Sequence, residues 1–187
     1  MMRMLAFALY PALALAGCPS DISELRSASV LATSFDAALL NGTWNEVAYT
    51  DPAQVGASCQ KSENTYHAAD GKIDQKFTCK YGRIPFGMTY EYAPVAGVPG
   101  RYDKYAKGLS NLLILPTAVV DVRWAEDGSA QHMSEYTCKD GVTEFRVSSR
   151  DLTMAPGLYQ DMLDVALAAG VPSEIIAKVS VNDYAGC

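Results

Sequence analysis

The chain has 187 residues, a formal net charge of −6 and five cysteines. This length suits one domain of ordinary size, which buries a core without needing a metal to hold it together. Lysines and arginines are scattered singly within an acidic chain, which argues against nucleic acid as a partner. After residue 17, no stretch reaches the ~18 consecutive apolar residues of a membrane-spanning helix.

Residues 1–17 are typical of a secretory signal peptide. One early cation, Arg3, precedes an apolar run from Leu5 to Ala16 that ends in small residues. The tetrapeptide Leu15-Ala16-Gly17-Cys18 also satisfies the lipobox of bacterial lipoproteins, in which Cys18 becomes the lipidated first residue. The sequence therefore predicts a secreted, extracellular protein, with an outer-membrane lipoprotein anchored through Cys18 as the alternative.

The cysteines lie far apart and form no CxxC pair, and only His67 and His132 are available to help them bind a metal. Disulfides are therefore predicted in place of a metal site, and no cofactor is expected. Because the number of cysteines is odd, one thiol is lipidated, free or bonded to another chain.

Residues 18–34 are polar, small and weakly patterned, which predicts an extended N-terminal arm and no packed element. From Trp44 to Ser149 short strands alternate with turn residues. Two hairpins stand out, because their turns contain residues that accept positive φ. Asp70-Gly71 joins strands at 60–69 and 72–81, and Lys139-Asp140-Gly141 joins strands at 131–138 and 142–149.

Apolar residues alternate with polar ones in two of these strands. One face carries Ile73, Phe77, Cys79 and Tyr81, broken only by Gln75, and in the next strand it carries Phe86, Met88, Tyr90 and Tyr92. One dry and one wet face are typical of an antiparallel barrel or sandwich. The stretch 112–124 is less regular, and Pro116 predicts an edge, a bulge or a bend there.

The pattern becomes helical after Arg150. Pro156 is suited to begin a helix that runs to Ala169, and Gly170 is suited to end it. The order along the chain is thus an arm, about eight strands, one helix and a tail that ends on Cys187.

The segment 35–44, which ends in Gly42-Thr43-Trp44, resembles the N-terminal signature of the lipocalins. Arg150 at the end of the last strand, the helix after it and the terminal Cys187 match that family at the right separations. The chain is most similar to the apolipoprotein D and bacterial lipocalin branch over residues 35–187. The middle motif of the family, usually Thr-Asp-Tyr, is here at best part of 126–129.

The resemblance implies an all-β fold, an eight-stranded antiparallel up-and-down β-barrel with a C-terminal α-helix packed on its side. It also implies that Trp44 plugs the narrow end of the barrel and that Arg150 lies across the indole, where a cation stabilises by ~1–2 kcal/mol when shielded from water. Gly42, Trp44 and Arg150 are therefore structural and not ligand contacts.

By position, the cysteines match a pattern that pairs Cys18 with Cys138 and Cys59 with Cys187, which leaves Cys79 unpaired. Two alternatives stay open. Lipidation of Cys18 removes the partner of Cys138, and a bridge from Cys79 to Cys187 is the arrangement of other lipocalins.

The function that the resemblance implies is extracellular binding and transport of one small hydrophobic ligand in the barrel: a fatty acid, lysolipid, retinoid, sterol or pigment. No catalysis is expected. The protein is expected to be a monomer or weak homo-oligomer that meets a membrane only if Cys18 is lipidated. The side chains predicted to line the cavity are Phe77, Phe86, Met88, Tyr90, Leu113, Leu115 and Phe145.

Two other functions remain as alternatives. An enzyme of the same fold that modifies a lipid or a xanthophyll would use Cys79 as its nucleophile, which requires a thiol of lowered pKa. A membrane-tethered lipoprotein, or a subunit of a pigment complex, would need no chemistry at all.

Overall fold

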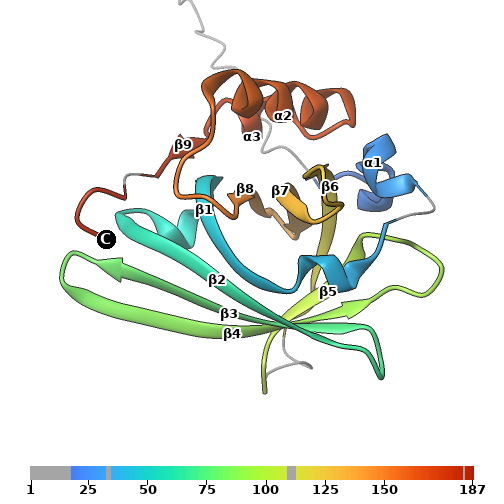
Figure 1. Ribbon diagram of the computed structural model, residues 1–187, viewed down its shortest axis with the longest axis horizontal. Coiled ribbons are helices and arrows are strands. Elements are labelled where there is room, and N and C mark those ends of the chain that lie inside the picture. The colour runs from blue at the N-terminus through green and yellow to red at the C-terminus, as the bar shows by residue number, and fades with distance from the viewer. Residues whose placement is uncertain (1–17, 33–34, 109–112, 183) are drawn as a thin grey trace, which may run out of the picture.

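The computed structural model describes residues 18–187 with the exception of 33–34, 109–112 and 183. The predicted signal peptide lies outside the described residues. Eight strands of the described chain close into an antiparallel up-and-down barrel, which confirms the predicted fold (Figure 1). The strands are β1 (Gly42–Thr50), β2 (Ala57–His67), β3 (Lys72–Tyr81), β4 (Ile84–Pro94), β5 (Arg101–Ala106), β6 (Leu115–Trp124), β7 (Ala130–Lys139) and β8 (Val142–Ser149), with a short β9 (Ser180–Val181) beside β1.

Both predicted hairpins are confirmed. β2 pairs with β3 across a turn in which Gly71 has φ +71°, and β7 pairs with β8 across Asp140 and Gly141, with φ values of +50° and +83°. Pro116 is the second residue of β6, ahead of the first pair with β7 at Thr117, so its missing N–H interrupts no bond to that strand.

The barrel closes through β1 over only part of its length. Residues 42–45 pair with 61–64 of β2, after which β1 departs from β2 and runs along β8 and β9. The C-terminal tail lies across this opening, where the single O–H of Tyr184 lies within hydrogen-bonding distance of two carbonyl oxygens, those of Glu46 at 3.0 Å and Gln60 at 2.6 Å. A disulfide from Cys59 to Cys187 fixes the same tail to β2.

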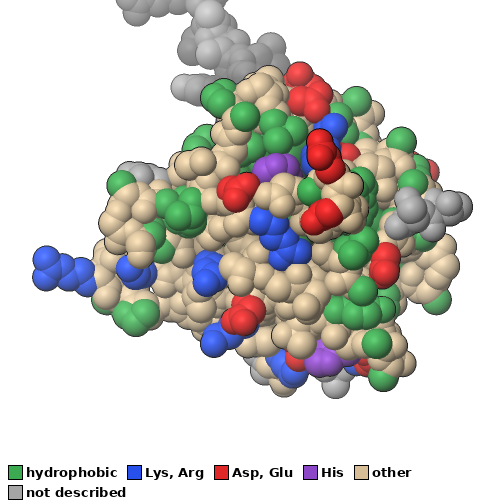
Figure 2. All heavy atoms as spheres, in the orientation of Figure 1, with side chains coloured by type: hydrophobic (Ala, Val, Ile, Leu, Met, Phe, Trp, Pro, Cys, Tyr) green, Lys and Arg blue, Asp and Glu red, His purple; other side chains and the backbone are tan. Residues whose placement is uncertain are grey.

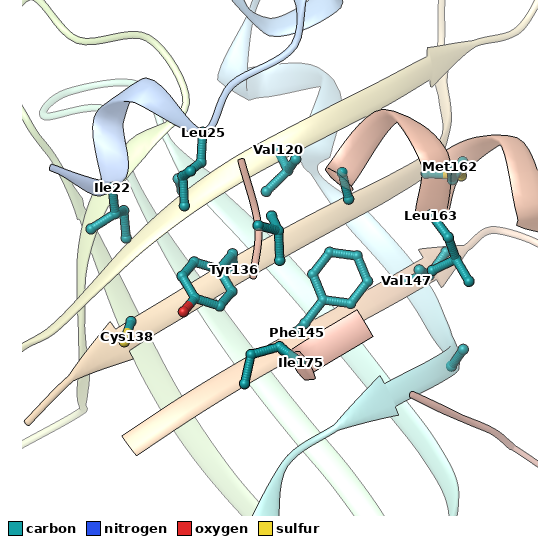
Figure 3. Close-up of a cluster of buried hydrophobic side chains, with 14 of the residues drawn as sticks. Ile22, Leu25, Val120, Tyr136, Cys138, Phe145, Val147, Met162, Leu163 and Ile175 are labelled. Atoms are coloured by element: carbon teal, nitrogen blue, oxygen red, sulfur yellow. The ribbon is translucent and has the colours of Figure 1, made fainter. Parts of the chain in front are cut away.

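The C-terminal helices cover one side of the barrel (Figure 1). The predicted helix is confirmed as α2 (Pro156–Ala168), and Gly170 follows it at φ +100°; a shorter α3 (Ser173–Ile176) comes next. Met162 and Leu163 of α2 pack on the outer face of the sheet (Figure 3), and Ala166 of the same helix belongs to this cluster. This hydrophobic core therefore lies outside the barrel, between sheet and helices.

The expectation of an extended arm is wrong. Residues 22–24 form the 3₁₀ turn η1 (Ile22–Glu24) and residues 28–31 form α1 (Ala28–Leu31), both packed against β6. Apolar side chains of the arm are buried there, and the Ser27 and Ser29 hydroxyls donate to Asp121 at 2.6 and 2.8 Å. The arm is therefore ordered by two kinds of contact with the sheet: buried apolar side chains and the hydrogen bonds of Ser27 and Ser29 to Asp121.

A disulfide from Cys18 to Cys138 ties the arm to β7, so both bridges follow the pairing that the family resemblance implied, and Cys79 is free and buried.

On the face shown in Figure 2, basic side chains are interspersed with acidic ones. In the described part of the chain, no helix has the length and apolar character needed to cross a membrane.

Candidate ligand-binding site

Trp44 closes one end of the barrel. The 3₁₀ turn η2 (Ala37–Leu40) crosses this end, and its last carbonyl, that of Leu40, accepts hydrogen bonds from the Trp44 indole at 2.8 Å and from the Asn64 amide at 3.1 Å. The indole is fully buried. The end left open is the opposite one, where β3 ends and β4 begins.

Arg150 fastens this closed end from outside. Its guanidinium carbon lies 3.8 Å from the centre of the Trp44 ring. Its nitrogens donate to four backbone carbonyls at 2.8 to 3.1 Å, those of Leu39, Asn41, Thr43 and Ala130. Gly42 has φ +94°, and a Cβ there would stand 3.3 Å from the guanidinium, so the glycine is needed for both its conformation and its small size.

A cavity of about 110 Å³ lies at the open end. A cavity of about this size holds a group similar to a benzene ring. Its lining residues are Asp51, Ala53, Gln54, Phe77, Tyr81, Phe86, Met88, Tyr90, Lys104, Glu144 and Arg146. Deeper in the barrel, between Gln75, Glu135 and Leu40, the open space shrinks to about 10 Å³, so this half of the interior is filled.

Four of the predicted cavity residues come together here: Phe77, Phe86, Met88 and Tyr90. They alternate along β3 and β4 and face inward as the two strands pair. Phe77 is buried, whereas Phe86 and Met88 are 42% and 37% exposed at the mouth. The mouth thus presents an apolar wall to solvent.

Two other predicted residues lie near the mouth without lining the cavity. Leu115 pairs with Lys104 and so shares its inward face, half-buried at the start of β6. Leu113 precedes that strand and is 51% exposed. Both remain proposals as ligand contacts.

Phe145 is not a cavity residue. It is fully buried on the outer face of β8, against Met162, Leu163 and Ile175 of the C-terminal helices (Figure 3). The alternate residues of β8, Glu144, Arg146 and Ser148, face the interior instead. The apolar face of this strand therefore faces the helices, and the polar face lines the barrel.

Arg146 is the centre of a buried polar network. Its guanidinium donates to the Glu135 carboxylate at 2.6 and 2.7 Å, to Gln75 at 3.1 Å and to the Tyr92 hydroxyl at 2.5 Å. Burial alone would lower the pKa of Arg146, but Glu135 and the neighbouring acidic groups raise it well above its usual range. The guanidinium is thus held charged in the middle of the barrel.

Lys104 and Glu144 form a second buried ion pair, with 2.5 Å between Nζ and Oε2. Burial opposes ionisation of Glu144, but Lys104 and Arg146 more than offset it and lower the pKa of this carboxyl. Glu46 behaves in the opposite way, because burial raises its pKa to about 8. Its nearest cation is Arg146, 3.7 Å away.

Cys79 faces the same interior, yet it is poorly suited to act as a nucleophile. Burial raises the pKa of its thiol, and the carboxyl of Glu46 raises it further. A reactive thiolate needs the reverse environment. These surroundings argue against the enzymatic alternative.

Sequence reasoning missed the interior ion pairs. Two signals for them were present: Gln75 interrupts the apolar face of β3, and charged residues recur at every second position of β8, as Glu144 and Arg146.

His67 pairs with Asp74 at 3.1 Å on the outer rim of the closed end, far from the cavity. Among the described residues no three His, Cys, Asp or Glu side chains are grouped to hold a metal.

The comparisons with known proteins concern the fold alone. No family model matches the sequence, and no curated protein matches it. Solved structures do resemble it. Apocrustacyanin C1 superposes with a TM-score of 0.62 at 12% identity, over 80% of each chain.

The fold is the lipocalin fold. Insecticyanin from the tobacco hornworm Manduca sexta gives a TM-score of 0.59 at 15% identity, over 80% of this chain and 81% of the other. The siderocalin Ex-FABP, which functions through dual ligand specificities, gives a TM-score of 0.56 at 15% identity, over 80% of this chain and 97% of the other. These lipocalin structures share the barrel and its C-terminal helix with the present chain.

Proposed function

We propose that this protein binds one small hydrophobic molecule, or the apolar part of an amphipathic one, in the open end of its barrel. The observation that carries the proposal is the cavity of about 110 Å³ beneath Phe86 and Met88, in a barrel whose other end is closed by Trp44. Fatty acids, lysolipids, retinoids, sterols and pigments are the candidate ligands. The mechanism is reversible burial, without catalysis.

A rim of exposed apolar side chains supports this proposal. A ligand larger than the cavity extends past Phe86 onto this rim, so that its body is desolvated by side chains that are otherwise exposed to water. The large apolar residues exposed around the open end are Val55, Ile84, Phe86, Met88, Leu113, Ile114 and Val142.

We further propose that the protein is secreted and acts outside the cell as a monomer or weak homo-oligomer. The two disulfides support an oxidising environment. The bond between Cys18 and Cys138 occupies the thiol that lipidation would need, which favours the secreted form over the lipoprotein. The same pairing favours the apolipoprotein D-like branch of the lipocalins.

The test is titration of the purified mature protein with palmitate, a lysophosphatidylcholine, retinol, cholesterol and a carotenoid, monitored by tryptophan fluorescence and native mass spectrometry. We expect saturable binding of one molecule per chain for at least one probe. If none of these compounds binds saturably, the proposal fails.

A matched pair of variants locates the site. Met88 and Leu167 are 37% and 40% exposed, but Met88 lines the cavity and Leu167 lies on α2. Met88→Gln is expected to weaken binding about tenfold, since it removes apolar contact worth ~1–1.5 kcal/mol. Leu167→Gln should leave affinity unchanged. Equal effects of the two substitutions would show that the ligand binds elsewhere.

A further inference from the structure

The interior of the barrel holds more carboxyl groups than cations. Glu46, Glu135 and Glu144 face inward, whereas Lys104 and Arg146 are the only buried lysine or arginine side chains in the described part of the chain. Asp51 adds a further carboxyl at the mouth. With all of these groups ionised, the site carries an excess of negative charge.

The two cations are already committed to partners. Arg146 donates to Glu135, Gln75 and Tyr92, and its Nη1 lies 3.7 Å from both Glu46 and Glu144. Lys104 pairs with Glu144 and lies 4.8 Å from the centre of the Tyr90 ring. An anionic ligand entering the cavity would therefore meet carboxylates whose cations are engaged.

Among the described residues, Glu46 is the interior carboxyl that lacks a hydrogen-bond donor, and its contact with Arg146 spans 3.7 Å. It is 1% exposed, and neither of its side-chain oxygens accepts a hydrogen bond from any residue that the structure describes. A buried carboxylate without donors is strongly destabilising, so this group needs either a proton or an added positive charge nearby. The charged and titratable groups that interact electrostatically with Glu46 are Arg146 and Glu144 from β8, Lys104 from β5, Tyr90 from β4, Cys79 from β3, Tyr49 from β1, Asp51 from the β1–β2 connection and Tyr184 from the tail.

The walls of the cavity also suit a cation. Tyr81, Phe86 and Tyr90 line it, and Tyr81 and Phe86 are in edge contact with centroids 6.1 Å apart. Aromatic faces attract an ammonium group, most strongly where water is excluded. Lys104 already shows this contact with Tyr90.

We propose that the ligand is a small amphipathic amine, whose aromatic or aliphatic body lies against Phe77, Phe86 and Met88 and whose ammonium group binds the Glu144 carboxylate. The second cation at Glu144 then leaves Arg146 Nη1 to Glu46. The three carboxylates inside the barrel, Glu46, Glu135 and Glu144, are then matched by three cations. This inference rests on the proposed function, because it names the class of molecule that the same cavity takes.

The test compares three probes of one shape, 2-phenylethylamine, 2-phenylethanol and phenylacetate, by isothermal titration calorimetry on the full mature protein at pH 7. We expect the amine to bind at least about tenfold more tightly than the other two, a preference of ~1.4 kcal/mol. Burial raises the pKa of Glu46 to about 8, so an added positive charge that favours the carboxylate should release a proton at pH 7. This release is detected as different heats in phosphate and Tris buffers.

Glu46→Gln should reduce the preference for the amine to less than about threefold and abolish proton release, while leaving affinity for 2-phenylethanol unchanged. Glu126→Gln makes the same chemical change at an exposed turn next to the closed end and should alter nothing. Circular dichroism of both variants verifies that the barrel is folded.

The remaining outcomes separate this inference from the proposed function. Equal binding of amine and alcohol, or tighter binding of phenylacetate, overturns the choice of an amine but leaves binding in the cavity intact. Binding of palmitate or retinol with no binding of the three probes has the same meaning. If no compound binds at all, the proposed function itself fails.

Discussion

Replacing Arg150 tests whether the closed end of the barrel depends on the planar guanidinium or only on a positive charge. The side chain donates to four carbonyls on three separate segments, the η2 turn, the start of β1 and the start of β7, while it covers the Trp44 ring. Arg150→Lys retains the charge but loses the fork of donors, so its effect isolates the geometry.

The magnitude follows from the exposure of these bonds. Three of the four carbonyl bonds are exposed to solvent, and we assign them about 0.5 kcal/mol each, with about 1 kcal/mol for the bond to Ala130. The contact with Trp44 adds about 1 kcal/mol. We therefore expect Arg150→Ala to lower the free energy of unfolding by about 3.5 kcal/mol and Arg150→Lys by about 1.5 kcal/mol.

The measurement is equilibrium unfolding in urea, followed by far-ultraviolet circular dichroism so that a change in Trp44 emission does not distort it. Arg83→Lys is the matched control, because Arg83 is exposed in the turn between β3 and β4 at the open end. If Arg150→Lys and Arg83→Lys differ by less than about 0.5 kcal/mol, the guanidinium contacts contribute no specific stability and the reasoning is refuted.

Three further predictions concern the core, the buried carboxyl and the tail. Phe145→Ala should destabilise the fold by about 3–5 kcal/mol in urea unfolding yet leave ligand affinity unchanged, and a loss of affinity with little loss of stability would contradict its place under the helices. Because burial raises the pKa of Glu46 to about 8 from an ordinary 4.5, its contribution favours folding at low pH and fades as pH rises between these values. Glu46→Gln should therefore be more stable than the native protein at pH 8.5 by at least about 1 kcal/mol, with the difference vanishing near pH 4; a difference that does not change with pH would refute this. Replacing Cys59 and Cys187 together by serine should cost up to about 4–5 kcal/mol and speed proteolysis of the tail, and an unchanged midpoint and cleavage rate would argue against the role of the bridge.

The sequence predicted the apolar half of the site and missed its polar half. The alternation of Phe86, Met88 and Tyr90 in a single strand fixes their common face, because a strand has a period of two. It does not show that Lys104, which lies on another strand, is brought to the same cavity. The position of Lys104 beside these three residues depends on how the strands pair and how the barrel closes.

The Phe145 error shows why alternation alone does not identify the interior. In β8 the apolar residues alternate with Glu144 and Arg146, and the simplest expectation places apolar side chains inside a barrel. Helices α2 and α3 bury the outer face of β8 instead, which leaves the charged face to line the cavity. Nothing within the strand itself distinguishes these two arrangements.

The closed end of the barrel illustrates what the sequence determined by itself. Gly42, Trp44, the β7–β8 turn and the helix that begins at Pro156 are local signals, because each depends on backbone conformation or on residues close in the chain. They predict the hairpin and the C-terminal helix, and the resemblance to the lipocalins adds the up-and-down strand order and the tryptophan that closes the barrel. Only the tertiary structure decided which face of each strand became the interior and which charges meet there. The physical reason is that the bonds of Arg146 to Gln75 and Tyr92 and its approach to Glu46 join strands far apart in sequence, and their burial depends on how the sheet closes and what covers it.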